Sequence, residues 1–114
     1  MTEIQESQGS PVYLNKEMYN RKILKEFIEV LIENNALDNA RINRYESDEE
    51  LVDFLFLLLT NRERNILAKI YGLTDGIEKS HEEIAEEYKV TSVRIRQIEQ
   101  KAFRKMRFPI KKQA

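Results

Sequence analysis

The chain has 114 residues, a length that suits one small domain or one domain with an appendage, and its formal net charge is −1. It contains no cysteine, which excludes a disulfide framework and a cysteine-ligated metal site, and no apolar run reaches the roughly 18 residues of a membrane span. The polar first residues do not have the pattern of a secretion signal, so we expect a cytoplasmic protein with no membrane partner.

Charge is distributed unevenly along the chain. Residues 1–59 hold 6 Lys/Arg and 12 Asp/Glu, whereas residues 89–114 hold 9 Lys/Arg and 1 acidic residue. This asymmetry favours a polyanionic partner at the C-terminal end. A basic helix that only presents its charges to water is the alternative.

The first 46 residues predict a flexible arm over 1–14 and an N-terminal helical extension over 15–46. The main helix of the extension is expected at about 16–34, because apolar residues recur there every three or four positions, as on one buried helix face. They are Tyr19, Ile23, Leu24, Phe27, Ile28, Leu31 and Ile32. We expect this stripe to pack on the rest of the chain. Pairing with a second copy is the alternative, so the chain is a monomer or a homodimer.

Three Ser/Thr-x-x-Glu sequences predict the starts of the next helices. In this capping box the first side chain and the glutamate each accept a hydrogen bond from the other residue's backbone N–H. Ser47, Thr60 and Ser80 stand at the first position. They predict a helix at about 48–59 that is apolar on all sides, a helix that ends at Gly72, and a short third helix.

The last predicted helix begins after Thr91, and we expect it to end at or just before Pro109. At the helical period its apolar residues form one narrow stripe, and polar residues occupy the opposite side. The stripe comprises Ile95, Ile98, Ala102 and Met106, and the opposite side comprises Val93, Gln97, Gln100 and Arg104, flanked by Arg94, Arg96, Lys101 and Arg107. The fold prediction is all-α, with about five helices and a C-terminal helix-turn-helix in a domain over 47–114.

A basic helix that follows a short helix and a tight turn is typical of a recognition helix. One α-helix fits the major groove of B-DNA, where Arg, Gln and Ser can donate to base edges while Lys and Arg reach phosphates. The start of the preceding helix, at Ser80, His81 and Glu82, can offer backbone N–H groups to a further phosphate.

The stretch SHEEIAEEYKVTSVRIRQIEQKAFRKMRFP closely resembles the end of region four of bacterial sigma-70 family factors, the module that binds the promoter −35 element. The preceding stretch LLTNRERNILAKIYGLTDG resembles the first part of the same region, so the resemblance covers about 50–109. It implies a sequence-specific transcription factor without a cofactor. The implied partners are double-stranded promoter DNA, the β flap of the RNA polymerase core, and a second sigma-like subunit or regulator.

The resemblance, together with the helix faces, assigns candidate binding residues. The candidates for DNA contact are Ser80, His81, Glu82, Thr91, Ser92, Val93, Arg94, Arg96, Gln97, Lys101 and Arg104. The candidates for contact with polymerase or another partner are the apolar Phe54, Leu58, Ile66 and Ile70, with the basic Lys105 and Arg107.

Two departures from the family pattern bear on function. The family usually has Arg-Glu directly after the capping threonine, and these residues contact −35 bases. This chain has Ser92 and Val93 there, which predicts a different DNA target. Nothing in the chain resembles the aromatic-rich domain that melts the −10 element. The alternative function is therefore a protein-interaction module that binds polymerase and completes or mimics a sigma factor, with DNA contact secondary.

No enzymatic or metal site is predicted. His81 is the single histidine, so no histidine pair can hold a metal ion, and we expect its side chain to be solvated in the first turn of its helix. Phosphate-binding loops and nucleophile motifs are absent from the sequence.

Overall fold

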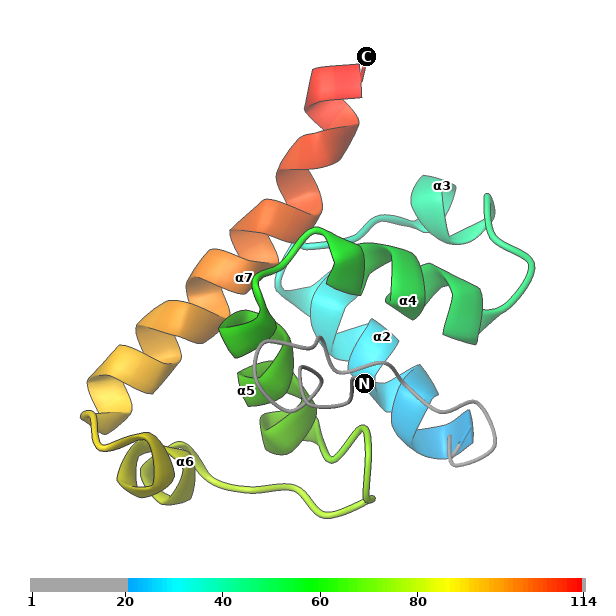
Figure 1. Cartoon of the computed structure of the whole chain (residues 1–114). Helices are drawn as coiled ribbons and strands as arrows, with labels where there is room; N and C mark the ends of the chain where they lie inside the picture. The colour runs from blue at the N-terminus through cyan, green and yellow to red at the C-terminus, as the bar shows by residue number, and fades with distance from the viewer. Residues whose placement is uncertain (1–20, 114) are drawn as a thin grey trace, which may run out of the picture.

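The computed structural model describes residues 21–113, and the side chains of 21–38 and 41–107 among them. The predicted arm over 1–14 therefore lies outside the described residues. In chain order the helices are α2 (Arg21–Glu33), α3 (Asn39–Ile42), α4 (Asp48–Leu57), α5 (Asn61–Tyr71), α6 (His81–Tyr88) and α7 (Ser92–Gln113) (Figure 1). No strand occurs within 21–113, and the all-α prediction is confirmed.

The predicted capping residues begin three of these helices. Thr60 and Ser80 each form a complete capping box with the glutamate three residues later. At Ser47 only half of the box forms, because the Glu50 carboxylate accepts from the N–H of Glu46 at 3.0 Å. Local hydrogen bonds of this kind satisfy N–H groups that the first helical turn leaves without a partner.

Gly72 ends α5 in the left-handed backbone region, at φ 64°. A Cβ at this position would lie 3.0 Å from the backbone of Ile77, so the position excludes a side chain as well as favouring glycine. The sharp reversal that follows leads the chain into the loop before α6.

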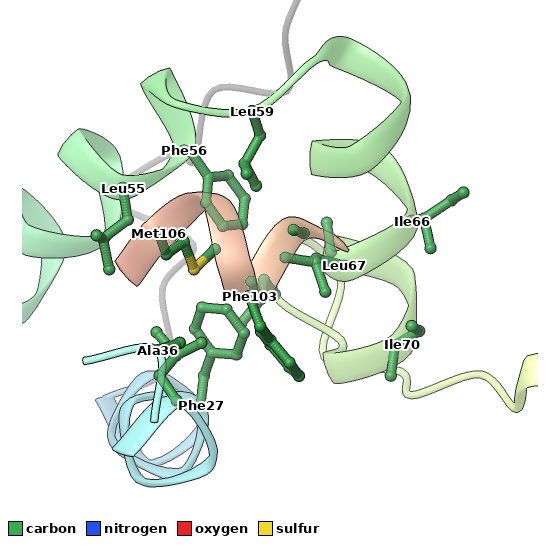
Figure 2. Close-up of a cluster of buried hydrophobic side chains, with 14 of the residues drawn as sticks. Phe27, Ala36, Leu55, Phe56, Leu59, Ile66, Leu67, Ile70, Phe103 and Met106 are labelled. Carbon is green, nitrogen blue, oxygen red and sulfur yellow. The ribbon is translucent and has the colours of Figure 1, made fainter. Parts of the chain in front are cut away.

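One hydrophobic core joins the N-terminal extension to the remainder of the described chain. The rings of Phe27 and Phe56 are nearly perpendicular, with 6.1 Å between their centroids, and the centroid of the Phe27 ring lies 5.2 Å from that of Tyr71. Phe103 and Met106 of α7 reach the same cluster (Figure 2). The apolar stripe of α2 packs on this core, mainly beside α4, as the sequence predicted. Its buried members are Leu24, Phe27, Ile28 and Leu31, whereas Ile23 and Ile32 are partly buried and Tyr19 lies outside the described residues.

Two helix ends differ from the sequence predictions. The helix expected over 48–59 stops at Leu57, whose side chain is 67% exposed. The expected end of the last helix at Pro109 is wrong, because α7 continues to Gln113 (Figure 1). A proline so near a helix end removes only one backbone hydrogen bond, the bond to the carbonyl of residue 105, and the turns on either side can still form. None of the described helices is long and apolar enough to cross a membrane.

Candidate nucleic-acid interface

The turn between α6 and α7 sets the direction of the last helix. Lys89 ends α6 in the left-handed region at φ 59°, and the N–H of Val90 donates to the carbonyl of Ala85 at 3.0 Å. The Thr91 hydroxyl then accepts from the N–H of Arg94 at 3.1 Å, which caps α7. These local bonds turn the chain sharply between two packed helices.

The apolar side of α7 is docked against the body of the domain. Ile95, Ile98, Ala102 and Met106 are all buried, and α7 packs on both α5 and α6. Phe103, which the sequence analysis left outside the stripe, is buried as well. The helix therefore cannot rotate its basic side inward without exposing this apolar surface.

The opposite side of α7 lies in solvent. Along its first four turns the exposed side chains are Val93, Arg94, Arg96, Gln97, Gln100, Lys101 and Arg104, while Ser92 is half-buried. We call these eight residues the α7 ridge. Its polar members carry donors for base edges and phosphates, and its four cations have no acidic residue among them.

Glu99, the single acidic residue of α7, lies in a buried cluster and not on the α7 ridge. Glu99 is buried, accepts a hydrogen bond from the Tyr71 hydroxyl, and lies 2.9 Å from Nε2 of His81 through its other carboxylate oxygen. Burial of the phenol, reinforced by its bond to the Glu99 carboxylate, raises the pKa of Tyr71. A carboxylate on the exposed side would repel DNA phosphates, and this placement avoids that repulsion.

The predicted solvation of His81 is wrong. Its side chain is only 23% exposed because it packs beside Glu99 of α7, a contact across 18 positions of sequence that helix periodicity does not reveal. At the same end of α6 the N–H of Ser80 and that of Glu83 are already paired within the capping box, and Glu82 and Glu83 add negative charge. A phosphate contact at Ser80, His81 and Glu82 stays a prediction that this chemistry does not favour.

Two basic residues in the second half of α7, Lys105 and Arg107, make contacts within the protein. The Lys105 ammonium lies 2.9 Å from the Glu63 carboxylate, and Nη1 of Arg107 lies 3.4 Å from the carbonyl oxygen of Asn35. Arg41 of α3 is buried and donates to the carbonyl of Met106. Contact of Lys105 and Arg107 with a partner therefore stays a prediction that would require these bonds to be shared or exchanged.

The apolar candidates for partner binding divide into two groups. Ile66 and Ile70 are 0% and 8% exposed and belong to the core. Their contact with a partner stays a prediction that would require the core to open. Phe54 and Leu58 are half-buried at the surface, where the Phe54 ring lies 5.6 Å from the ring of Tyr45. Leu57, which the sequence analysis did not single out, is the most exposed of the apolar side chains near them. The all-round apolar character of this helix was the signal that could have identified it.

Together, the tight turn, the docked apolar side and the exposed cationic ridge define a helix-turn-helix DNA-binding domain. Residues 56–107 match the family described as sigma-70, region 4, and this part of the chain belongs to that family, which is non-enzymatic. The chain is 42% identical over 86 residues, 75% of its length, to the RNA polymerase sigma factor SigA of a Bacillus species. It spans 22% of the length of that relative. No solved structure is significantly similar to the chain.

Proposed function

We propose that the chain acts in transcription initiation in the cytoplasm, binding promoter DNA through α7 and RNA polymerase through α4. The single observation that supports DNA binding is the orientation of α7. Its aliphatic side is buried while Arg96, Gln97 and Arg104 stand in solvent on the other side. A helix in this orientation can enter a major groove without unfolding any part of the domain.

The proposed roles follow from position along the ridge. Ser92, Val93, Arg96 and Gln97 lie in the first two turns and face base edges, as the N-terminal residues of recognition helices do. Arg94 and Lys101 flank them and hold phosphates, and Arg104 extends the backbone contact further along the groove.

Polymerase contact is proposed for a small apolar surface on and just after α4, formed by Phe54, Leu57 and Leu58. Leu57 is 67% exposed. When a partner covers an apolar side chain of this size, its removal from water lowers the free energy of the complex. The same surface supports the second candidate function, in which the chain mainly binds polymerase and DNA contact is secondary.

DNA binding is tested with the full chain on duplexes selected from a random-sequence library, by fluorescence anisotropy at increasing salt. Neutralising about 4–6 phosphates predicts a slope of log Kobs against log salt of about −4 to −5. The double variant Arg96→Ala/Gln97→Ala should lose selectivity, whereas Arg44→Ala, which removes one exposed cation outside α7, should bind as the wild type does. Absence of binding at low salt, or a flat salt dependence, contradicts the proposal.

To separate the two candidate functions, polymerase capture and transcriptional activity are compared between the Arg96→Ala/Gln97→Ala variant and Leu57→Asp. Capture of core polymerase should be lost with Leu57→Asp and kept with the matched control Ile77→Asp, another exposed apolar side chain. Full transcriptional activity of the Arg96→Ala/Gln97→Ala variant in the cell would favour the interaction module over the DNA-binding factor.

A further inference from the structure

Val93 is an exposed apolar side chain among the polar side chains of the α7 ridge. The described residues expose three large hydrophobic side chains, Leu57, Ile77 and Val93, and of these only Val93 lies on α7. Its exposed fraction is 59% although it is in the first turn of a helix whose other apolar residues are buried. Packing within the domain therefore does not account for a valine at this position.

The direction of the Val93 side chain is fixed by the helix cap and by its own rotamer preference. The Thr91 cap holds the first turn of α7, and a β-branched side chain in a helix has one strongly preferred rotamer. The isopropyl group is therefore presented in a defined direction. It lies on the same side of α7 as Gln97, about one helical turn further toward the C-terminus, and Arg104, about three turns further.

Base edges offer such a group few partners. In the major groove guanine and adenine present nitrogen and oxygen acceptors and an amino group, and cytosine presents an amino donor. Thymine alone among the four bases adds a C5 methyl group to its edge. A valine pressed against any other edge covers polar atoms and leaves them without hydrogen bonds, which weakens binding.

We propose that Val93 is a specificity-determining residue that selects a thymine at one base pair of the DNA site through contact with the thymine C5 methyl group. This inference rests on the proposed function, because it requires the ridge to enter a major groove. It goes further than that function because it names the chemical group that is recognised, the thymine methyl. It also gives Val93 an apolar contact, whereas its neighbours Arg94 and Arg96 donate hydrogen bonds.

The test removes the methyl group and nothing else. In a duplex selected by the full chain, each thymine is replaced in turn by uracil and the Kd is measured by fluorescence anisotropy. At one thymine of the site the wild type should bind roughly fourfold more weakly after replacement, the effect of about one buried methyl group. Val93→Ala should bind the thymine and uracil duplexes equally at that position.

Three controls make the result specific. Ile77→Ala removes an equally exposed apolar group outside α7 and should keep the full uracil effect. Circular dichroism should show unchanged helix content in Val93→Ala, because the side chain supports no packing. Placing 5-methylcytosine at the identified position should recover affinity relative to cytosine.

The outcomes also separate this inference from the function on which it rests. Salt-dependent DNA binding in which wild type and Val93→Ala show the same uracil effects would overturn the role of Val93 and leave the proposed function supported. Failure of the wild type to bind any selected duplex at low salt would overturn both.

Discussion

At the scale of single residues, Glu99 shows how the single acidic residue of α7 is kept away from its exposed cations. It is the single acidic residue within 89–114, and it lies buried between Tyr71 and His81 instead of among the exposed cations. Its carboxylate accepts a hydrogen bond from Tyr71 of α5 and contacts His81, the first residue of α6, so it links both helices to α7. A buried polar group of this kind is stabilising only while its partners remain in place.

We expect Glu99→Ala to lower the free energy of unfolding by about 1–3 kcal/mol, because the Tyr71 hydroxyl and the His81 ring lose a buried partner. Glu99→Gln keeps a hydrogen-bond acceptor and should lower the free energy of unfolding by less. Urea denaturation followed by circular dichroism measures both values, with the exposed neighbour Gln100→Ala as the matched control. Equal stability of Glu99→Ala and Gln100→Ala would show that the cluster contributes nothing.

At the scale of elements, the second half of α7 is tied to the first turn of α5. Glu63 accepts from the N–H of Thr60 at 2.9 Å and from the Lys105 ammonium at the same distance. Burial of the carboxylate would raise its pKa, but the hydrogen bonds from Thr60 and Lys105, with the charge of Lys105, outweigh burial and lower the pKa of Glu63. A capping box thereby also fixes the position of a neighbouring helix.

The lowered pKa gives this contact a defined pH dependence. Its stabilising contribution is present above roughly pH 4.3, the ordinary pKa of glutamate, and is lost as the pH falls through the lower pKa of the folded state. Glu63→Gln should therefore be less stable than the wild type by about 1–3 kcal/mol at pH 7, and the difference should shrink in acid.

The measurement is urea unfolding at pH 7 and at successively lower pH. Glu83→Gln is the matched control, because Glu83 occupies the same place in the Ser80 capping box but is exposed. A wild-type advantage over Glu63→Gln that persists unchanged in acid would contradict the assignment of the effect to the ionised carboxylate.

At the scale of the whole molecule, the N-terminal extension shares its core with α7. Buried residues from Leu24 in α2 to Met106 in α7 form one cluster, and Phe27 of α2 lies against rings from α4 and α5. Arg41 adds a polar connection from α3 to α7. Since these elements bury one another, loss of α2 should also destabilise α7 and its exposed ridge.

We expect Phe27→Ala to lower the free energy of unfolding by about 3–5 kcal/mol and to reduce hydrogen-exchange protection throughout α7 as well as in α2, because cavities in a shared core destabilise the whole unit. Leu57→Ala, an exposed apolar residue, is the control. Loss of protection confined to α2 would instead identify the extension as a separate folding unit.

Local and periodic features of this protein follow from the sequence alone. The caps at Thr60 and Ser80 depend on atoms three residues apart, and the stripe from Ile95 to Met106 depends only on the helical period. The exposed ridge of α7 follows from that stripe, because burying one side of a helix leaves the other side in water. The helix-turn-helix and its cationic surface were therefore predictable.

Contacts between helices were decided by the tertiary structure. His81 with Glu99, Lys105 with Glu63, and the burial of Ile66 and Ile70 all join or cover residues from different elements. A sequence pattern gives the face of a helix on which a residue lies, but it does not give the element that packs on that face. This is why the buried and exposed sides of α7 were correctly predicted, while the exposed apolar residues near α4 could be recognised only once the helices had been placed.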